Sequence, residues 1–176
     1  MKRFSIKKQI IVILALICCF FFYGCNASNP FVFESNSNNV NQKQKLNEIF
    51  DTLLIALESK DEKTIKNLMA PELANTSETL TTEIQCAFEF FEGNVISCEN
   101  IKNVSEGEKY DNGKLIYLRI GNARIPEIIT DTNTYKISFS AVLINAKNPD
   151  QEGVWRVWIG KDNGESIVIG SDDYDL

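Results

Sequence analysis

The sequence predicts an α+β fold in which three N-terminal helices pack on a curved antiparallel sheet of four to five strands. From residue 43 to residue 92, apolar side chains recur at the spacing of one helix face. After Gly93 the apolar period shortens to two, which is typical of strands with one buried face. Turn sequences then separate the apolar runs. Helices that precede the strands in this way predict a helical layer on one face of the sheet.

The helices are expected in the first half of the domain. The first covers residues 43–61 and ends near Asp61, which is expected to cap a short second helix. Its apolar face comprises Leu46, Ile49, Phe50, Leu53, Leu54 and Leu57. We expect Pro71 to end the second helix, and the third helix to cover residues 77–92 before Gly93 stops it.

The strands are expected to follow Gly93. Their expected ranges are 94–104, 114–129, 134–146, 154–160 and 166–170. Turn signals such as DNG at residues 111–113 lie between them. The second of these strands is expected to bend or bulge near Gly121 to Pro126, because neither residue suits a regular ladder.

The clearest alternation lies in residues 134–146. One face of this strand is expected to carry Tyr135, Ile137, Phe139, Ala141 and Leu143, and the other Lys136, Ser138 and Ser140.

The N-terminus is typical of an export signal that ends at a lipidation site. Basic residues precede the apolar run Ile10–Tyr23, which is 14 residues long, whereas a helix that spans a bilayer needs about 20. Gly24 and Cys25 follow, as at the cleavage site of bacterial lipoproteins, where the cysteine is lipidated and becomes the new N-terminus. Phe22 and Tyr23 depart from the usual residues before that cysteine. An uncleaved signal anchor is the alternative, and it also tethers the chain to the membrane outside the cytoplasm.

This interpretation divides the chain into three parts. Residues 1–24 are expected to be a lipoprotein signal peptide, residues 25–42 an Asn- and Ser-rich tether, and residues 43–176 the α+β domain. The expected location is the extracytoplasmic face of the cell membrane, with the lipid on Cys25 as the anchor.

The charge balance argues against nucleic acid as a partner. The chain carries 18 basic and 24 acidic side chains, a net charge of −6, and loss of the four basic residues of the signal peptide leaves −10. A domain this acidic repels the phosphates of DNA, RNA and anionic lipid headgroups.

The residue types present exclude the familiar hydrolytic sites. The chain has no histidine, which excludes Ser-His-Asp and Cys-His catalysis and histidine zinc sites. Neither the KDNGE loop at residues 161–165 nor the acidic GSDDYDL end at residues 170–176 has the spacing of a calcium loop, so both are expected to be solvated. Cys86 and Cys98 are expected to be buried free thiols, with a disulfide between them as the alternative. We therefore expect no metal, no cofactor and no catalytic residue.

A binding role is expected for the GVWRVWIG strand. Trp155 and Trp158 are three residues apart, so they face opposite sides of a regular strand. One tryptophan should pack on the helices, and the other should be exposed beside Arg156, on the face that Val154 would share. An exposed Trp–Arg pair suits a ligand or partner, with Tyr117 as a further candidate. The alternative is that the second tryptophan covers a sheet face or a dimer contact.

Four segments carry a family resemblance: ALESKDEKTIKNLMAPEL (56–73), FFEGNVIS (90–97), ITDTNTYKISF (129–139) and NAKNPDQEGVW (145–155). Together they resemble an uncharacterised family of small lipoproteins of Gram-positive bacteria that is similar to the NTF2-like superfamily. The resemblance covers roughly residues 43–170. It implies a cystatin-like cone, a strongly bent sheet wrapped around the helices, often with a cavity at the open end. It brings no catalytic residues.

The function expected from the sequence is a membrane-anchored, non-catalytic domain that binds a small molecule or a protein. One alternative is an accessory surface protein that forms a homodimer through its open sheet face. Another is an isomerase- or dehydratase-type enzyme that uses an Asp base and a Tyr donor inside the cone. The candidates for that chemistry are Tyr117, Tyr135, Glu127 and Asp131.

Overall fold

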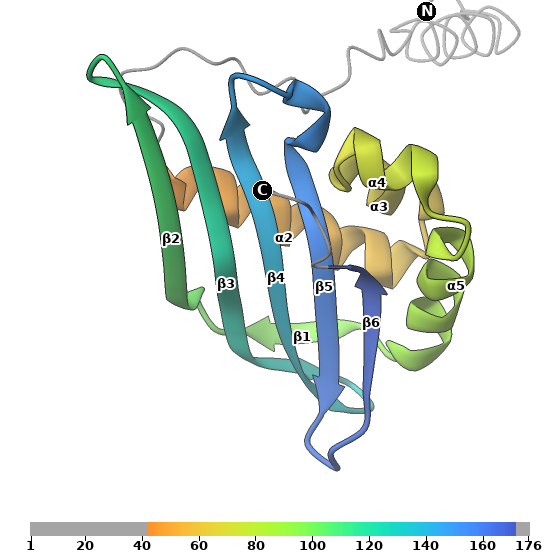
Figure 1. The fold of residues 1–176 in the computed structure, drawn as a ribbon. Helices are drawn as coiled ribbons and strands as arrows, with labels where there is room; N and C mark the ends of the chain where they lie inside the picture. Colours follow the sequence, from red (N-terminus) through yellow and green to blue (C-terminus); the bar gives the residue numbers. More distant parts are fainter. Residues whose placement is uncertain (1–41, 172–176) are drawn as a thin grey trace, which may run out of the picture. The chain divides into compact units, whose positions relative to one another are not determined.

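A computed structural model describes residues 42–171, and Figure 1 shows its ribbon. This part of the chain is α+β, with helices first and an antiparallel sheet after them. Its helices are α2 (Gln42–Ser59), α3 (Glu62–Leu68), α4 (Pro71–Thr76) and α5 (Leu80–Phe90). Its strands are β1 (Val95–Cys98), β2 (Lys102–Asp111), β3 (Lys114–Thr130), β4 (Thr134–Asn145), β5 (Gly153–Lys161) and β6 (Ser166–Gly170), with a 3-10 turn η1 (Pro149–Gln151) before β5. The predicted signal peptide, lipidation site and tether lie outside the described residues.

Residues 42–171 contain four helices, one more than the three expected. Asp61 caps α3 as predicted, because its Oδ1 accepts the N–H of Thr64 at 3.1 Å. The second helix ends before Pro71, as expected, but Pro71 also begins the unpredicted helix α4, at a position where a backbone N–H would have no helical acceptor. Between α3 and α4, the N–H of Ala70 donates to the carbonyl of Val154 at 2.9 Å. This bond ties the helices to the start of β5.

The sheet is built around β3. Its strand order is β1-β3-β4-β5-β6, and β2 also pairs with β3. Both β1 and β2 therefore use the same edge of β3, β2 along its first part and β1 at its end. The single strand predicted over residues 94–104 is split between β1 and β2, so the described part has six strands instead of four or five. Most of β2 is exposed and polar, and an edge strand of this kind has no apolar alternation to predict it.

The long strand β3 is irregular where the sequence predicts it. Its pairing with β4 shifts between Ile120 and Ala123 and again between Ile125 and Ile128, on either side of Arg124. The preceding turn is also as predicted: Asn112 and Gly113 both have positive φ, which is the geometry of a two-residue hairpin loop. These shifts decide which residues of β3 face each side of the sheet.

The helices cover one face of the sheet, called here the inner face; the opposite side is the outer face (Figure 1). The five residues predicted for the buried face of β4 are all 2% exposed or less, and they join one core with the helices. Phe88 and Phe91 from the end of α5 belong to the same core. The hydroxyl of Tyr135 accepts the N–H of Glu92 at 2.8 Å and donates to the carbonyl of Phe90 at 3.0 Å. These two bonds fasten the end of α5 to β4.

Candidate ligand-binding face

The two tryptophans of β5 lie on opposite faces of the sheet, as their spacing predicts. Trp155 is 3% exposed in the core, and its Nε1 donates to the carbonyl of Gln151 at 2.9 Å. Trp155 is therefore a packing residue, although the sequence makes it a candidate for binding. Trp158 is half-buried on the outer face. Val154 does not share that face as predicted, because the β4–β5 register shifts next to it and buries it opposite Ala141.

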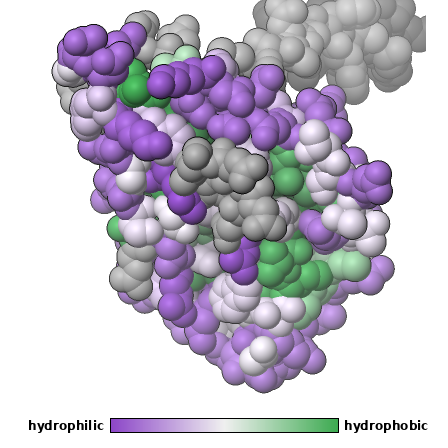
Figure 2. Space-filling view, viewed as in Figure 1, coloured by the Kyte–Doolittle hydropathy of each residue, from purple (hydrophilic) through white to green (hydrophobic). Residues whose placement is uncertain are grey.

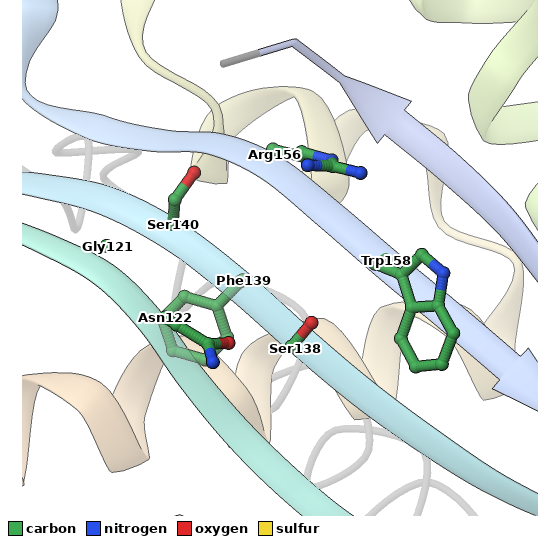
Figure 3. A pocket seen from close by; sticks show the side chains of 7 residues that line it. All are labelled: Gly121, Asn122, Ser138, Phe139, Ser140, Arg156 and Trp158. Atoms are coloured by element: carbon green, nitrogen blue, oxygen red, sulfur yellow. The ribbon is translucent and has the colours of Figure 1, made fainter. Parts of the chain in front are cut away.

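A hollow of about 200 Å³ lies on the outer face between β3 and β5. Its lining comprises Gly121, Asn122, Ser138, Phe139, Ser140, Arg156 and Trp158. Figure 3 shows Arg156 and Trp158 projecting from β5, with Ser138 and Ser140 beside them on β4. The register explains this arrangement: Trp158 is the direct cross-strand partner of Ser138, and Arg156 that of Ser140.

Two further arginines share the outer face with Arg156. Arg124 is the cross-strand partner of Ser138, and Arg119 that of Val142, two positions beyond Ser140 on β4. All three arginines of residues 42–171 therefore lie on one side of the sheet. We call Arg119, Arg124, Arg156 and Trp158 the arginine face.

The backbone pairing of the sheet places no acidic residue directly opposite an arginine of this face within residues 42–171. The six cross-strand partners of the three arginines are Gly107, Val142, Lys102, Ser138, Ser140 and Gly170. The neighbouring acids of β2 point the other way, because Glu106 and Glu108 pair with Ile120 and Leu118, which are core residues. Strand alternation thus places Glu106 and Glu108 on the opposite side of the sheet from Arg119. Figure 2 views the molecule from this side; hydrophilic residues predominate among the coloured atoms, beside a smaller hydrophobic patch.

Comparison with known proteins assigns the chain to a protein family. Residues 52–162, well over half of the chain, match the model of a family described as a domain of unknown function, DUF5104. The chain belongs to this family. The matched range runs from within α2 to the end of β5, so the whole arginine face lies inside the DUF5104 domain. No curated protein matches the chain.

Tyr117 lies further along the outer face of the DUF5104 domain, paired with Asn145. It lines a second hollow of about 300 Å³, with Lys109 Nζ 5.1 Å from its ring centre. Its hydroxyl is buried and has no hydrogen-bond partner among residues 42–171. Burial raises the pKa of this phenol, and the charge of Arg119 partly opposes the effect. Of the predicted binding residues, the structure brings Arg156 and Trp158 together and leaves Tyr117 at a separate hollow.

The residues proposed for acid–base chemistry do not meet in the DUF5104 domain. Tyr135 is fully buried, and its hydroxyl is used at the end of α5. Asp131 lies in the exposed loop after β3, where its Oδ1 accepts the N–H of Asn94 at 2.9 Å; this bond and the one from the Asn94 amide lower its pKa. Glu127 is exposed on β3. Residues 42–171 also hold no cluster of three or more carboxylates and thiols placed to bind a metal ion.

The two cysteines of the domain are free and exposed. The expectation that Cys86 and Cys98 are buried is therefore wrong, and no disulfide joins them. Cys86 lies on the exposed side of α5, whereas its neighbours Ala87 and Phe88 are buried in the core.

Within residues 42–171 no helix combines the length and the apolar character that crossing a membrane requires.

The sequence alone does not identify Arg119 and Arg124 as part of the candidate site. The irregular register of β3 decides the side to which each projects, and no local spacing reveals it. The one available signal is compositional: these residues and Arg156 are arginines in an acidic chain whose other basic residues, apart from Arg3, are lysines.

Proposed function

We propose that this chain is a membrane-anchored extracytoplasmic lipoprotein whose domain binds an anionic ligand or partner segment on the arginine face without transforming it. The carrying observation is that Arg119, Arg124 and Arg156, the three arginines of residues 42–171, lie on the same side of the sheet as a half-buried tryptophan. The hollow between Arg156 and Trp158 supports a binding position that is shaped as well as charged.

Chemistry favours a carboxylate- or phosphate-bearing ligand. A guanidinium group can bind such an anion through two parallel N–H donors, a geometry that lysine does not offer. The hydroxyls of Ser138 and Ser140 line the floor of the same hollow and can orient the anion. The indole of Trp158 offers a flat apolar surface for the uncharged part of the ligand. The net charge of the chain, −6, opposes long-range attraction of anions, so affinity must come from these short-range contacts.

The fold relationship to the NTF2-like superfamily, with its cystatin-like cone, is part of this proposal. The support for it is the bent antiparallel sheet with helices on one face. The proposed binding face is the outer face, whereas a cone would place a ligand between sheet and helices. On the helix side, Phe88, Phe91 and Phe139 are core residues with 4% exposure or less.

The anchor is proposed on Cys25, which lies outside the described residues. Cys25→Ser in the producing bacterium is expected to prevent lipidation, so that the protein accumulates as an unprocessed precursor or leaves the membrane fraction. The mass of the protein and its fractionation measure this directly. A wild-type mass and membrane yield for Cys25→Ser would contradict the lipid anchor.

Binding is tested with poly-L-glutamate as the anionic probe. The full chain and a variant that ends at Ser171 are both titrated, because three aspartates follow at positions 172, 173 and 175 and can compete with the probe. We expect Arg156→Gln to weaken binding by about tenfold, the loss of one charge-assisted contact. Lys63→Gln removes the same charge from an exposed position of α3 and serves as the matched control. Equal affinity of the two variants, or no binding by either length of chain, would contradict the proposed face.

A further inference from the structure

We infer that the acidic segment Asp172–Leu176 of this chain docks on its own arginine face and competes with the external ligand. The inference rests on the proposed function, because it assigns a regulator to the same surface. It departs from the expectation that the acidic end is simply solvated. Three observations carry it: where β6 ends, how far the segment reaches, and the charges on both sides.

The chain leaves the sheet beside Arg156. Gly170, the last residue of β6, is the direct cross-strand partner of Arg156, and the N–H of Ser171 donates to the carbonyl of Trp155 at 3.0 Å. Gly170 has φ +79°, a left-handed conformation that turns the chain at this point. Asp172 and Asp173 therefore follow, two and three positions later in the sequence, the residue that pairs with Arg156.

The direction and length of the segment bring Arg119 within reach. Because β6 is antiparallel to β5, β6 runs toward the beginning of β5, and Ser171 already lies beside Trp155. Gly153, at that beginning, pairs with Val142, and Val142 pairs with Arg119. Arg119 lies on the third strand from β6, roughly 14 Å away at about 4.8 Å per strand. Six residues from Ser171 extend to about 20 Å.

The charges of the two partners are complementary. The segment carries three aspartates in the sequence DDYDL, and the arginine face carries three guanidinium groups. The segment is covalently joined to the sheet that carries the arginine face. A short flexible connection of this kind gives the segment a local concentration on the order of millimolar at that face. A contact that would be weak between separate molecules is therefore populated within one chain.

The test compares the full chain, solubilised in detergent, with the variant that ends at Ser171. Nuclear magnetic resonance follows the indole N–H of Trp158 and the Nε–H groups of the three arginines. The indole N–H of Trp155 is an internal control, since it is buried and bonded to Gln151. We expect removal of residues 172–176 to shift the Trp158 and arginine signals and to leave the Trp155 signal in place. Unchanged arginine and Trp158 signals would overturn the inference.

A synthetic peptide separates docking from general effects of truncation. Added to the shortened chain, SDDYDL is expected to restore the signal positions of the full chain, and its affinity should fall as salt is raised. The control peptide SNNYNL has the same length without the charges and should not bind. Equal binding of both peptides would overturn the role of the aspartates. The full-length variant with Asp172, Asp173 and Asp175 all changed to Asn should match the shortened chain.

Poly-L-glutamate distinguishes this inference from the proposed function. We expect the shortened chain to bind the polymer about tenfold more tightly than the full chain, because its competitor is gone. If the shortened chain binds the polymer but not SDDYDL, the inference falls and the proposed function stands. If SDDYDL docks but the polymer does not bind, the segment is confirmed as the occupant and the proposed external ligand class is wrong.

Discussion

The indole ring of Trp158 lies against Gly160, two residues further along the same face of β5. A Cβ atom at Gly160 would overlap the six-membered part of this ring, with Cζ3 only 3.1 Å away. The ring can lie down along the strand because residue 160 has no side chain. This relationship holds the tryptophan at the rim of the hollow that Arg156 shares.

Gly160→Ala is expected to push the Trp158 ring away from the strand. The displaced indole no longer covers the uncharged part of a ligand, so affinity for poly-L-glutamate should fall by roughly fivefold, about 1 kcal/mol. Titration and the Trp158 indole signal measure the two effects. Gly107→Ala is the matched control for the indole signal, because a Cβ there meets nothing within 4 Å. A Gly160→Ala variant with an unmoved indole signal would show that the ring does not depend on this glycine.

Trp155 and Trp158 should contribute differently to the stability of the fold. Trp155→Phe removes a buried hydrogen bond to Gln151 and leaves a gap in the core, which should cost about 1–3 kcal/mol of unfolding free energy. Trp158→Phe should change that free energy by only about 0.5 kcal/mol, since the side chain lies on the outer face and is only half-buried. Urea unfolding measures both values. Equal losses in the two variants would contradict the assignment of Trp155 to the core and Trp158 to the surface.

Tyr135→Phe is expected to destabilise the junction between α5 and β4. The variant leaves the N–H of Glu92 and the carbonyl of Phe90 without the hydroxyl that binds both, at a cost of about 1–3 kcal/mol. Tyr110→Phe is the control, because Tyr110 is 59% exposed and water can replace its bond to Glu108. Chemical denaturation should therefore show a clear loss for the first variant and almost none for the second.

Asp131 should make a pH-dependent contribution to stability. Its bonds from Asn94 lower the carboxyl pKa below the ordinary value of 3.8. A lowered folded-state pKa means that the stabilisation is complete above 3.8 and is lost as the pH falls through the folded-state value. Asp131→Ala should thus melt at a lower temperature than the wild type at pH 7, and the two melting temperatures should converge in strong acid. A constant difference down to pH 2 would contradict the role of ionisation.

Cys86 and Cys98 should both react with maleimide in the native protein, because both are free and exposed. Cys86→Ser and Cys98→Ser should each lose one label, as mass spectrometry would show. Slow labelling that requires denaturant would contradict the exposed positions and would support the buried thiols that the sequence predicts.

Several features of the fold could be predicted from local pattern. The apolar period of residues 43–61 predicted α2, and the alternation in residues 134–146 predicted which side chains of β4 are buried. The odd spacing of Trp155 and Trp158 predicted that they lie on opposite faces. Gly121 and Pro126 marked the irregular part of β3. In each case the signal lies within a few neighbouring residues, where backbone geometry alone relates position to side-chain direction.

The rest of the fold required the pairing of distant segments. The sequence of β2 has no apolar alternation from which a strand could be predicted. The strand forms because the edge of β3 offers backbone hydrogen-bonding groups. The start of α4 is held at the sheet by the bond from Ala70 to Val154, more than eighty positions along the chain, which no local pattern reveals.

The sequence by itself determined the apolar face of α2, the buried face of β4, the acidic balance of the chain and the opposed tryptophans. Only the tertiary structure decided that Arg119 and Arg124 join Arg156 on the outer face. The physical reason is the period of two: a register shift of one residue reverses the direction of every side chain beyond it. The shifts in β3 are set by its contacts with β2 and β4, so they are a property of the assembled sheet.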